Sequence, residues 1–113
     1  MNDCIFCKMV KKEIVPKIAF EDEDILAFHD ISPKAPVHLL IIPKKHLSDI
    51  GEMAEEDINL IGKMHYVAKK LAQDFAIDQS GYRLVTNCKK DSGQEVFHLH
   101  YHLIGGRQLG SFV

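Results

Sequence analysis

The sequence lacks several features that would assign it to a class at once. Its net charge is only −2, from 14 basic and 16 acidic residues, so no strong positive field is available to hold a nucleic-acid backbone. The longest aliphatic run, Leu39–Ile42, is far too short to cross a bilayer. Charged residues from Lys8 to Glu13 interrupt the segment where a signal peptide would be apolar. We therefore expect a cytoplasmic protein with neither a membrane nor nucleic acid as partner.

Cysteine is scarce, and repeats, low-complexity stretches and linkers are missing. The three cysteines of a cytoplasmic chain are better read as thiols or metal ligands than as disulfides. The Gly-x-x-x-x-Gly-Lys phosphate loop is also absent, which argues against ordinary ATPase chemistry. With 113 residues, 46% of them hydrophobic and 27% charged, the composition predicts a single globular domain spanning residues 1–113.

The order of the predicted elements indicates an α+β fold. Helical spacing of apolar residues predicts one long helix over residues 55–75, and residues 4–13 suit a short helix or turn. Strands are expected at residues 17–21, 24–28, 37–42, 82–87 and 98–104. Because regular βαβ alternation is missing, we predict a five-stranded antiparallel sheet with the long helix on one face, rather than a Rossmann sheet.

The most informative motif is His98-Leu99-His100-Tyr101-His102-Leu103-Ile104. Strict alternation over this run has the period of a β-strand, which places the three imidazoles on one face about 7 Å apart. Imidazole is a nucleophile, a proton carrier and a metal ligand near neutral pH. A strand that is histidine-rich without a function is the weaker interpretation, because each buried imidazole needs a hydrogen-bond partner.

A second motif, Cys4-x-x-Cys7, has the spacing of two thiolate ligands on one tetrahedral zinc ion. Two ligands do not close such a site, and His46 and His98 are the preferred remaining candidates. A thioredoxin-like redox pair is less favoured because the preceding strand is absent. The two cysteines could also be small apolar residues of a helical turn.

Weaker signals surround the histidine strand. Asn87 ends a predicted strand, and Ser92-Gly93-Gln94 forms a turn whose backbone amides can approach an anion. Asp30 follows another strand, where a carboxylate can accept from ribose hydroxyls, although a simple turn is equally consistent. His38 and His65 on their own are more consistent with structural roles.

Taken in order, these motifs resemble the histidine triad family, in its branch of purine nucleoside phosphoramidases. The resemblance covers nearly the whole chain and lies in these segments: Cys4-Ile5-Phe6-Cys7, Ala27-Phe28-His29-Asp30-Ile31-Ser32-Pro33, Ala35-Pro36-Val37-His38, Ile42-Pro43-Lys44-Lys45-His46, Gly93-Gln94-Glu95-Val96-Phe97-His98 and the triad through Gly105-Gly106-Arg107. It implies a homodimer that cleaves purine nucleoside monophosphate amides through a nucleotidyl-histidine intermediate.

The resemblance also implies roles for individual residues. His100 would be the nucleophile, with His102 and His38 as its helpers. The residues implied to line the nucleotide site are Phe6, Phe28, His29, Asp30, Ile31, Asn87, Gly93, Gln94, Glu95 and His102. A structural zinc ion would be held by Cys4, Cys7, His46 and His98. Glu95 departs from relatives that carry serine there, a residue assigned to protonation of the leaving group.

Two other hypotheses remain open at the level of sequence. One is a zinc-stabilised nucleotide-binding or adaptor protein without catalysis. The other is a zinc hydrolase in which His98, His100 and His102 bind one metal, although side chains about 7 Å apart on one strand converge poorly on one ion.

Overall fold

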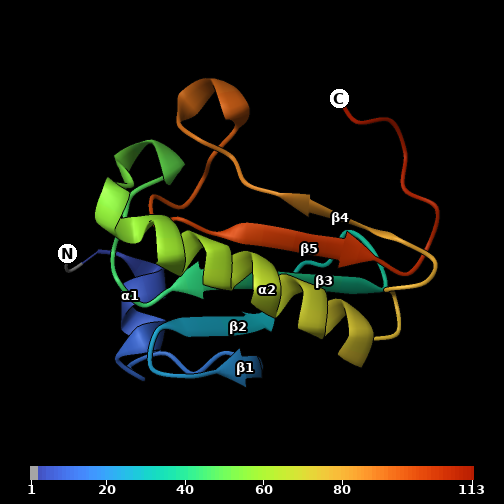
Figure 1. Ribbon diagram of the computed structural model, residues 1–113, viewed down its shortest axis with the longest axis horizontal. Helices are drawn as coiled ribbons and strands as arrows, with labels where there is room; N and C mark the ends of the chain where they lie inside the picture. The colour runs from blue at the N-terminus through green and yellow to red at the C-terminus, as the bar shows by residue number, and fades with distance from the viewer. Residues whose placement is uncertain (1–2) are drawn as a thin grey trace.

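A computed structural model, which describes residues 3–113, is built around a five-stranded sheet with a hydrophobic cluster on each face. The strands run in the order β1-β2-β3-β5-β4, and every neighbouring pair is antiparallel (Figure 1). Their bounds are β1 Ile18–Glu21, β2 Ile25–His29, β3 Val37–Pro43, β4 Tyr82–Val85 and β5 Tyr101–Gly105. The helices are α1 Ile5–Val10 and α2 Ile58–Asp74, with 3-10 turns at Ile50–Glu52, Glu55–Asp57 and Lys90–Ser92. The predicted fold class is confirmed.

The two faces of the sheet have different covers. Helix α2 packs on one face through apolar residues at the spacing i, i+3, i+4, i+7, i+8, namely Met64, Val67, Ala68, Leu71 and Ala72. On the other face, Phe6 of α1 packs with four strand residues, Leu26, Phe28, Leu40 and Ile42. Each fully buried side chain of this size stabilises the fold by about 1.5–3 kcal/mol. Strand alternation thus separates a helix-covered face from a face left partly open for a site.

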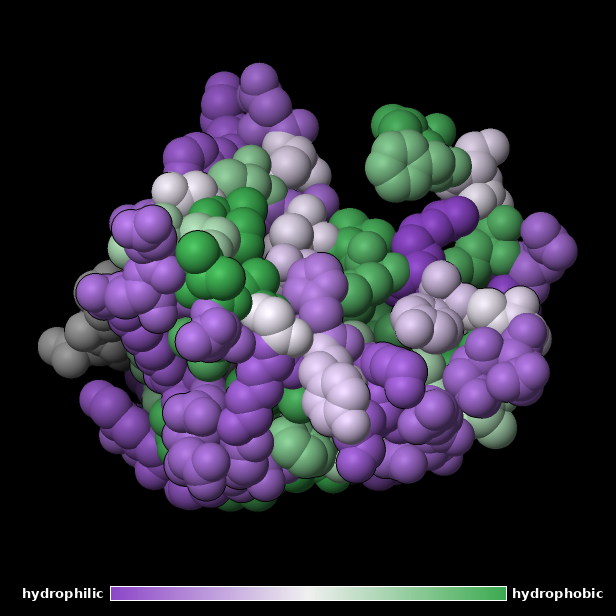
Figure 2. Space-filling model, viewed as in Figure 1, coloured by the Kyte–Doolittle hydropathy of each residue, from purple (hydrophilic) through white to green (hydrophobic). Residues whose placement is uncertain are grey.

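The outer surface of α2 is mostly polar, as Figure 2 shows for the face seen in Figure 1. Helix α2 is therefore amphipathic, and its apolar stripe packs on the sheet. No helix within residues 3–113 is long and apolar enough to cross a membrane.

Several element boundaries differ from the sequence prediction, and three of the differences bear on the site. Helix α2 begins at Ile58, after a 3-10 turn whose Asp57 carboxylate accepts from Ala54 N at 2.8 Å and from Lys45 Nζ at 2.6 Å. Strand β4 ends at Val85 rather than at residue 87.

Strand β5 begins at Tyr101, so His98 and His100 lie in the extended segment before it. The backbone there bonds outside the sheet ladder: Leu99 N donates to Leu47 O at 2.6 Å, and Thr86 Oγ1 donates to His100 O at 2.8 Å.

Candidate functional site

The alternation read from the histidine motif is present in the structure even though the strand is shorter. Leu99, Tyr101 and Leu103 belong to the core beneath α2. His98 and His100 are buried toward the other face, where their rings stand edge-on to Phe6 with centroids 5.9 and 5.2 Å away. The imidazoles consequently share the face that α1 only partly covers.

His100 has one ring nitrogen engaged and one available. Its Nδ1 lies 2.7 Å from the carbonyl oxygen of His98, and a carbonyl only accepts, so Nδ1 is assigned the hydrogen. In the neutral ring Nε2 then carries an unshared electron pair. Burial lowers the pKa of His100 below its ordinary value, which favours that neutral ring near pH 7. This is the protonation state of a nucleophile.

A second hydrogen-bond chain fixes the protons of His38 and His102. The backbone N–H of Lys34 donates to His38 Nδ1 at 3.0 Å, so the ring hydrogen of His38 is assigned to Nε2. That nitrogen donates to His102 Nδ1 at 2.9 Å and lies 3.4 Å from Asp30 Oδ2. His102 must then carry its hydrogen on Nε2, and burial lowers its pKa to about 4. The chain ends in a neutral N–H donor.

His100 and His102 line a small cavity of about 210 Å³. Its lining residues are Phe6, Asp30, Leu40, Asn87, Gly93, Glu95, Val96, His100 and His102. Gly93 has φ of +87°, a conformation that favours glycine and brings backbone to the cavity wall. The structure therefore gathers seven of the predicted site residues from α1, the ends of β2 and β4, the following loop and β5.

Leu40 and Val96 line the cavity but were not predicted from the sequence. Leu40 lies directly opposite His102 in the β3–β5 register. The signal was present, because Leu40 is two residues from His38 on a strand and must share its face.

Four predicted nucleotide-site residues lie apart from the cavity wall. Gln94 is buried, and its amide donates to Ser48 O and Val96 O while Oε1 accepts from Lys89 N. Phe28 is buried behind Phe6, with ring centroids 5.4 Å apart, and Ile31 is 98% exposed.

The His29 ring packs against Phe75, with ring centroids 5.4 Å apart, just beyond the end of α2. Its side chain therefore lies on the opposite face of the sheet from His102. This position gives no support to a side-chain contact between His29 and a nucleotide.

The predicted metal ligands also come together. Donor atoms of Cys4, Cys7, His46 and His98 lie within 4.8 Å of one another. The short separations are 3.3 Å from Cys4 Sγ to His98 Nδ1, 3.2 Å from Cys7 Sγ to His46 Nδ1 and 3.1 Å between the two Nδ1 atoms. Bonds of about 2.0–2.3 Å to tetrahedral zinc imply ligand–ligand edges of roughly 3.3–3.8 Å. The spacing is compatible with a single zinc ion, with two of these separations slightly shorter than the ideal edges.

The protonation of this cluster is also suited to a cation. His98 Nε2 donates to Pro43 O at 2.8 Å, so the electron pair on Nδ1 faces the thiols, and burial lowers the pKa of His98 to about 4. Burial, followed by the effect of Cys4, raises the pKa of Cys7 to about 11. A bound cation reverses that shift by stabilising the thiolate.

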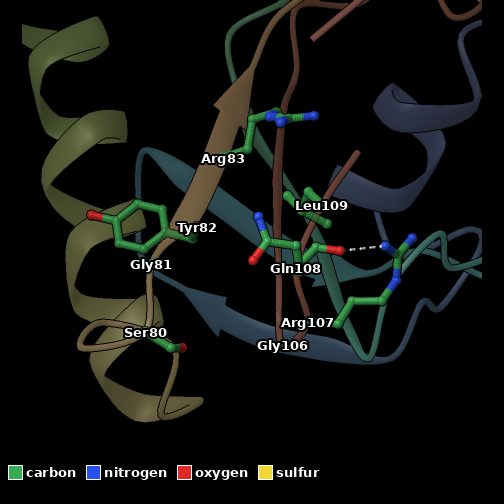
Figure 3. Close-up of a pocket in the computed structure, with 8 residues that line it drawn as sticks. All are labelled: Ser80, Gly81, Tyr82, Arg83, Gly106, Arg107, Gln108 and Leu109. Atoms are coloured by element: carbon green, nitrogen blue, oxygen red, sulfur yellow. Dashed lines mark hydrogen bonds between the residues drawn. The ribbon is translucent and has the colours of Figure 1, made fainter. Parts of the chain in front are cut away.

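A separate open hollow lies between β4 and the C-terminal segment (Figure 3). Its lining residues are Ser80, Gly81, Tyr82, Arg83, Gly106, Arg107, Gln108 and Leu109. Arg107 donates to Gln108 O and Lys34 O, and Arg83 donates to Gly110 O, so backbone carbonyls occupy both guanidinium groups. It contains none of the predicted catalytic residues.

Comparison with known proteins agrees with this geometry. A sequence model of the HIT domain matches residues 11–109. The chain belongs to the HIT family. This HIT chain is 43% identical over 109 residues to a purine nucleoside phosphoramidase of Escherichia coli K12, covering 96% of this chain and 92% of that protein.

Solved HIT structures show the same fold. A HIT family hydrolase from Legionella pneumophila is 50% identical with a TM-score of 0.94, and the match covers 96% of each chain. Another from Clostridium thermocellum is 46% identical with a TM-score of 0.95, over 100% of this chain and 98% of that one. The family resemblance drawn from the motifs is confirmed.

Proposed function

We propose that this HIT protein hydrolyses amides of purine nucleoside 5′-monophosphates through a covalent intermediate on His100. The observation that carries the proposal is that one cavity is lined both by His100, whose Nδ1 faces the His98 carbonyl, and by His102, which ends the hydrogen-bond chain from His38. Relatives named as HIT hydrolases and as a purine nucleoside phosphoramidase support the reaction class.

The first half-reaction forms a bond from His100 Nε2 to the α-phosphorus and breaks the phosphorus–amine bond. Negative charge grows on the phosphoryl oxygens, where the N–H of His102, the amide of Asn87 and the backbone around Gly93 can donate. The amine leaves with a proton added, because a protonated amine is a far better leaving group. Water then attacks phosphorus, releasing the nucleoside monophosphate and restoring His100.

The other cavity residues would contact the rest of the substrate, including the ribose and the leaving group. Asp30 Oδ1 accepts from Ser32 N at 2.7 Å, which fixes a carboxylate at the cavity wall for ribose hydroxyls. Phe6 supplies an apolar ring to the cavity wall. Glu95 is exposed at the rim and stands where a proton could be passed to the amine.

Zinc would be held by Cys4, Cys7, His46 and His98 in a closed tetrahedral set, and would stabilise the fold without activating water. His98 links the two regions, because its ring faces the thiols while its carbonyl accepts from His100 Nδ1. Fixing the ring therefore also orients the nucleophile.

The homodimer is likewise part of the proposal. Strand β4 is at the edge of the sheet, and Tyr82 on it is 40% exposed. An open edge strand offers unpaired backbone groups to a second copy. Sedimentation equilibrium should give twice the chain mass, and a monomer at micromolar concentration would contradict this part.

The reaction is tested by trapping the intermediate. Adenosine 5′-phosphoramidate is mixed with the protein, the reaction is quenched within milliseconds, and the peptides are analysed by mass spectrometry. We expect an adenylyl group on the peptide containing His100 and release of adenosine monophosphate in the steady state. Tight binding of adenosine monophosphate without any turnover would instead support a binding protein.

A further inference from the structure

The loop that joins β4 to the histidine segment contains a strained residue. Lys89 has φ of +71° and ψ of −173°, a region that is occupied almost only by glycine. The loop lies between Asn87 and Gly93, which both line the cavity. Strained backbone beside a site persists only where surrounding contacts hold it in place.

The contacts that hold Lys89 come from two sides. Its Nζ donates to both carboxylate oxygens of Asp49, at 2.9 and 2.8 Å, and Asp49 is only 4% exposed. Its backbone N–H donates to Gln94 Oε1 at 2.6 Å. Gln94 in turn donates to Ser48 O at 2.7 Å. The loop is thereby fastened at two points to the segment Ser48–Asp49.

Space is restricted on the Gly51 side of the ion pair, whereas the Lys89 side chain is 64% exposed. A Cβ atom added at Gly51 would lie 2.9 Å from Asp49 Oδ1 and 3.2 Å from Lys89 Nζ. The ion pair lowers the pKa of Asp49, so the carboxylate stays charged near neutral pH. Segment 48–49 also follows directly on His46 and Leu47, and Leu47 O accepts from Leu99 N between the histidines.

We propose that the Asp49–Lys89 ion pair is a positioning device that holds Asn87 and Gly93 in place to receive the substrate phosphate. Lys89 acts through the loop backbone and not by touching substrate. The inference rests on the proposed function for its kinetic readout. It also has a binding readout that does not need turnover.

The test compares three substitutions at one position with a neighbour. Lys89→Met removes the ion pair but leaves a side chain in the strained conformation. Lys89→Arg keeps the pair, and Lys89→Gly removes both the pair and the strain. Lys90→Met is the matched control, because it removes a positive charge from the same loop and Lys90 is absent from the salt bridges of residues 3–113.

We expect Lys89→Met to weaken binding of adenosine monophosphate, measured by calorimetry, and to lower kcat/KM by about 10–100-fold, mainly through KM, because a loop misplaced by about 1 Å loses its contacts. Lys89→Arg should stay within about threefold of wild type, and Lys89→Gly should lie between, because the loop is no longer driven from its conformation. Asp49→Asn should reproduce the Lys89→Met pattern with the His100 adduct still formed.

The inference is overturned if Lys89→Met behaves as Lys90→Met does in both binding and KM. It is also overturned if Lys89→Arg fails to rescue while circular dichroism shows a folded protein. Failure of the proposed function gives a different result, because the wild-type protein would then form no adduct. The affinities of these variants for adenosine monophosphate would still test the positioning role.

Discussion

Two clusters that contain histidines lie at opposite ends of segment 98–102, and in each the possible metal-ligand atoms lie within 4.8 Å of one another. One is Cys4, Cys7, His46 and His98; the other is Asp30, His38 and His102. They differ in the direction of their hydrogen bonds. In the first, the outer N–H of His98 is bound by Pro43 O, so electron pairs and thiols point at one another. In the second, the N–H of Lys34 donates to His38 and the N–H of His38 donates to His102, where the chain ends in an N–H that points to the cavity side.

The difference shows why ligand type and spacing alone do not identify a metal centre. Converging electron pairs repel unless a cation or proton lies between them, whereas a continuous donor–acceptor chain is satisfied without one. Which case applies depends on the backbone group at the outer ring nitrogen. In His98 it is an acceptor, Pro43 O, and in His38 it is a donor, Lys34 N. One cluster is thus suited to zinc, and the other to handling a phosphate group.

The largest expected effect comes from removing the nucleophile that sits between the two clusters. His100→Ala should lower turnover of an adenosine phosphoramidate by about 10⁴-fold or more, because the other groups cannot form the intermediate. Binding of adenosine monophosphate and the metal content should persist. Steady-state rates with inductively coupled plasma analysis check both. Turnover within tenfold of wild type would refute the role of His100.

Breaking the first cluster should affect stability above all. Cys7→Ser removes a thiolate ligand, and a structural zinc site contributes directly to the free energy of folding. We expect substoichiometric zinc and a Tm lower by at least about 10 °C, which corresponds to a few kcal/mol for a chain of this size. Cys88→Ser is the control, because Cys88 is outside the cluster. One zinc per chain and an unchanged Tm in Cys7→Ser would contradict the assignment.

Breaking the second cluster should affect rate but not metal content. His38→Asn removes the donor that fixes the hydrogen of His102 on Nε2, so His102 can present an acceptor to the phosphate instead. The expected loss in kcat is about 100-fold, typical of a misplaced proton in acid–base chemistry. Zinc content and Tm should change little. Loss of zinc in this variant would show that the clusters do not act separately.

Much of this comparison could be predicted from sequence, because alternation and spacing follow from backbone geometry. The shared face of His98, His100 and His102 and the pairing of Cys4 with Cys7 are of that kind. Ring hydrogens were not predictable, since they depend on Pro43 O and Lys34 N, which only tertiary structure brings close.

The positions of two residues that lie apart from the cavity wall have related causes. Gln94 looked available for phosphate, but it is consumed by Ser48 O, Val96 O and Lys89 N, contacts made across loops. His29 points to the helix-covered face because side chains alternate along a strand and its neighbour Phe28 points to the other face. That alternation is visible in the sequence.

The smallest expected effect is the pH dependence of stability from His102. Its folded pKa of about 4 lies below the unfolded value of about 6.5, so between these values the unfolded chain binds more protons. Stability is therefore complete above about pH 6.5 and falls as the pH drops toward 4. Denaturant unfolding of wild type and of His102→Gln from pH 7.5 to 4.5 gives the slope of stability against pH for each protein. The acid sensitivity of the Cys4, Cys7, His46 and His98 cluster is common to both and cancels in the difference. We expect a shallower decline in the variant. Parallel curves would mean that His102 keeps an ordinary pKa, and that the second cluster is wetter than its hydrogen bonds indicate.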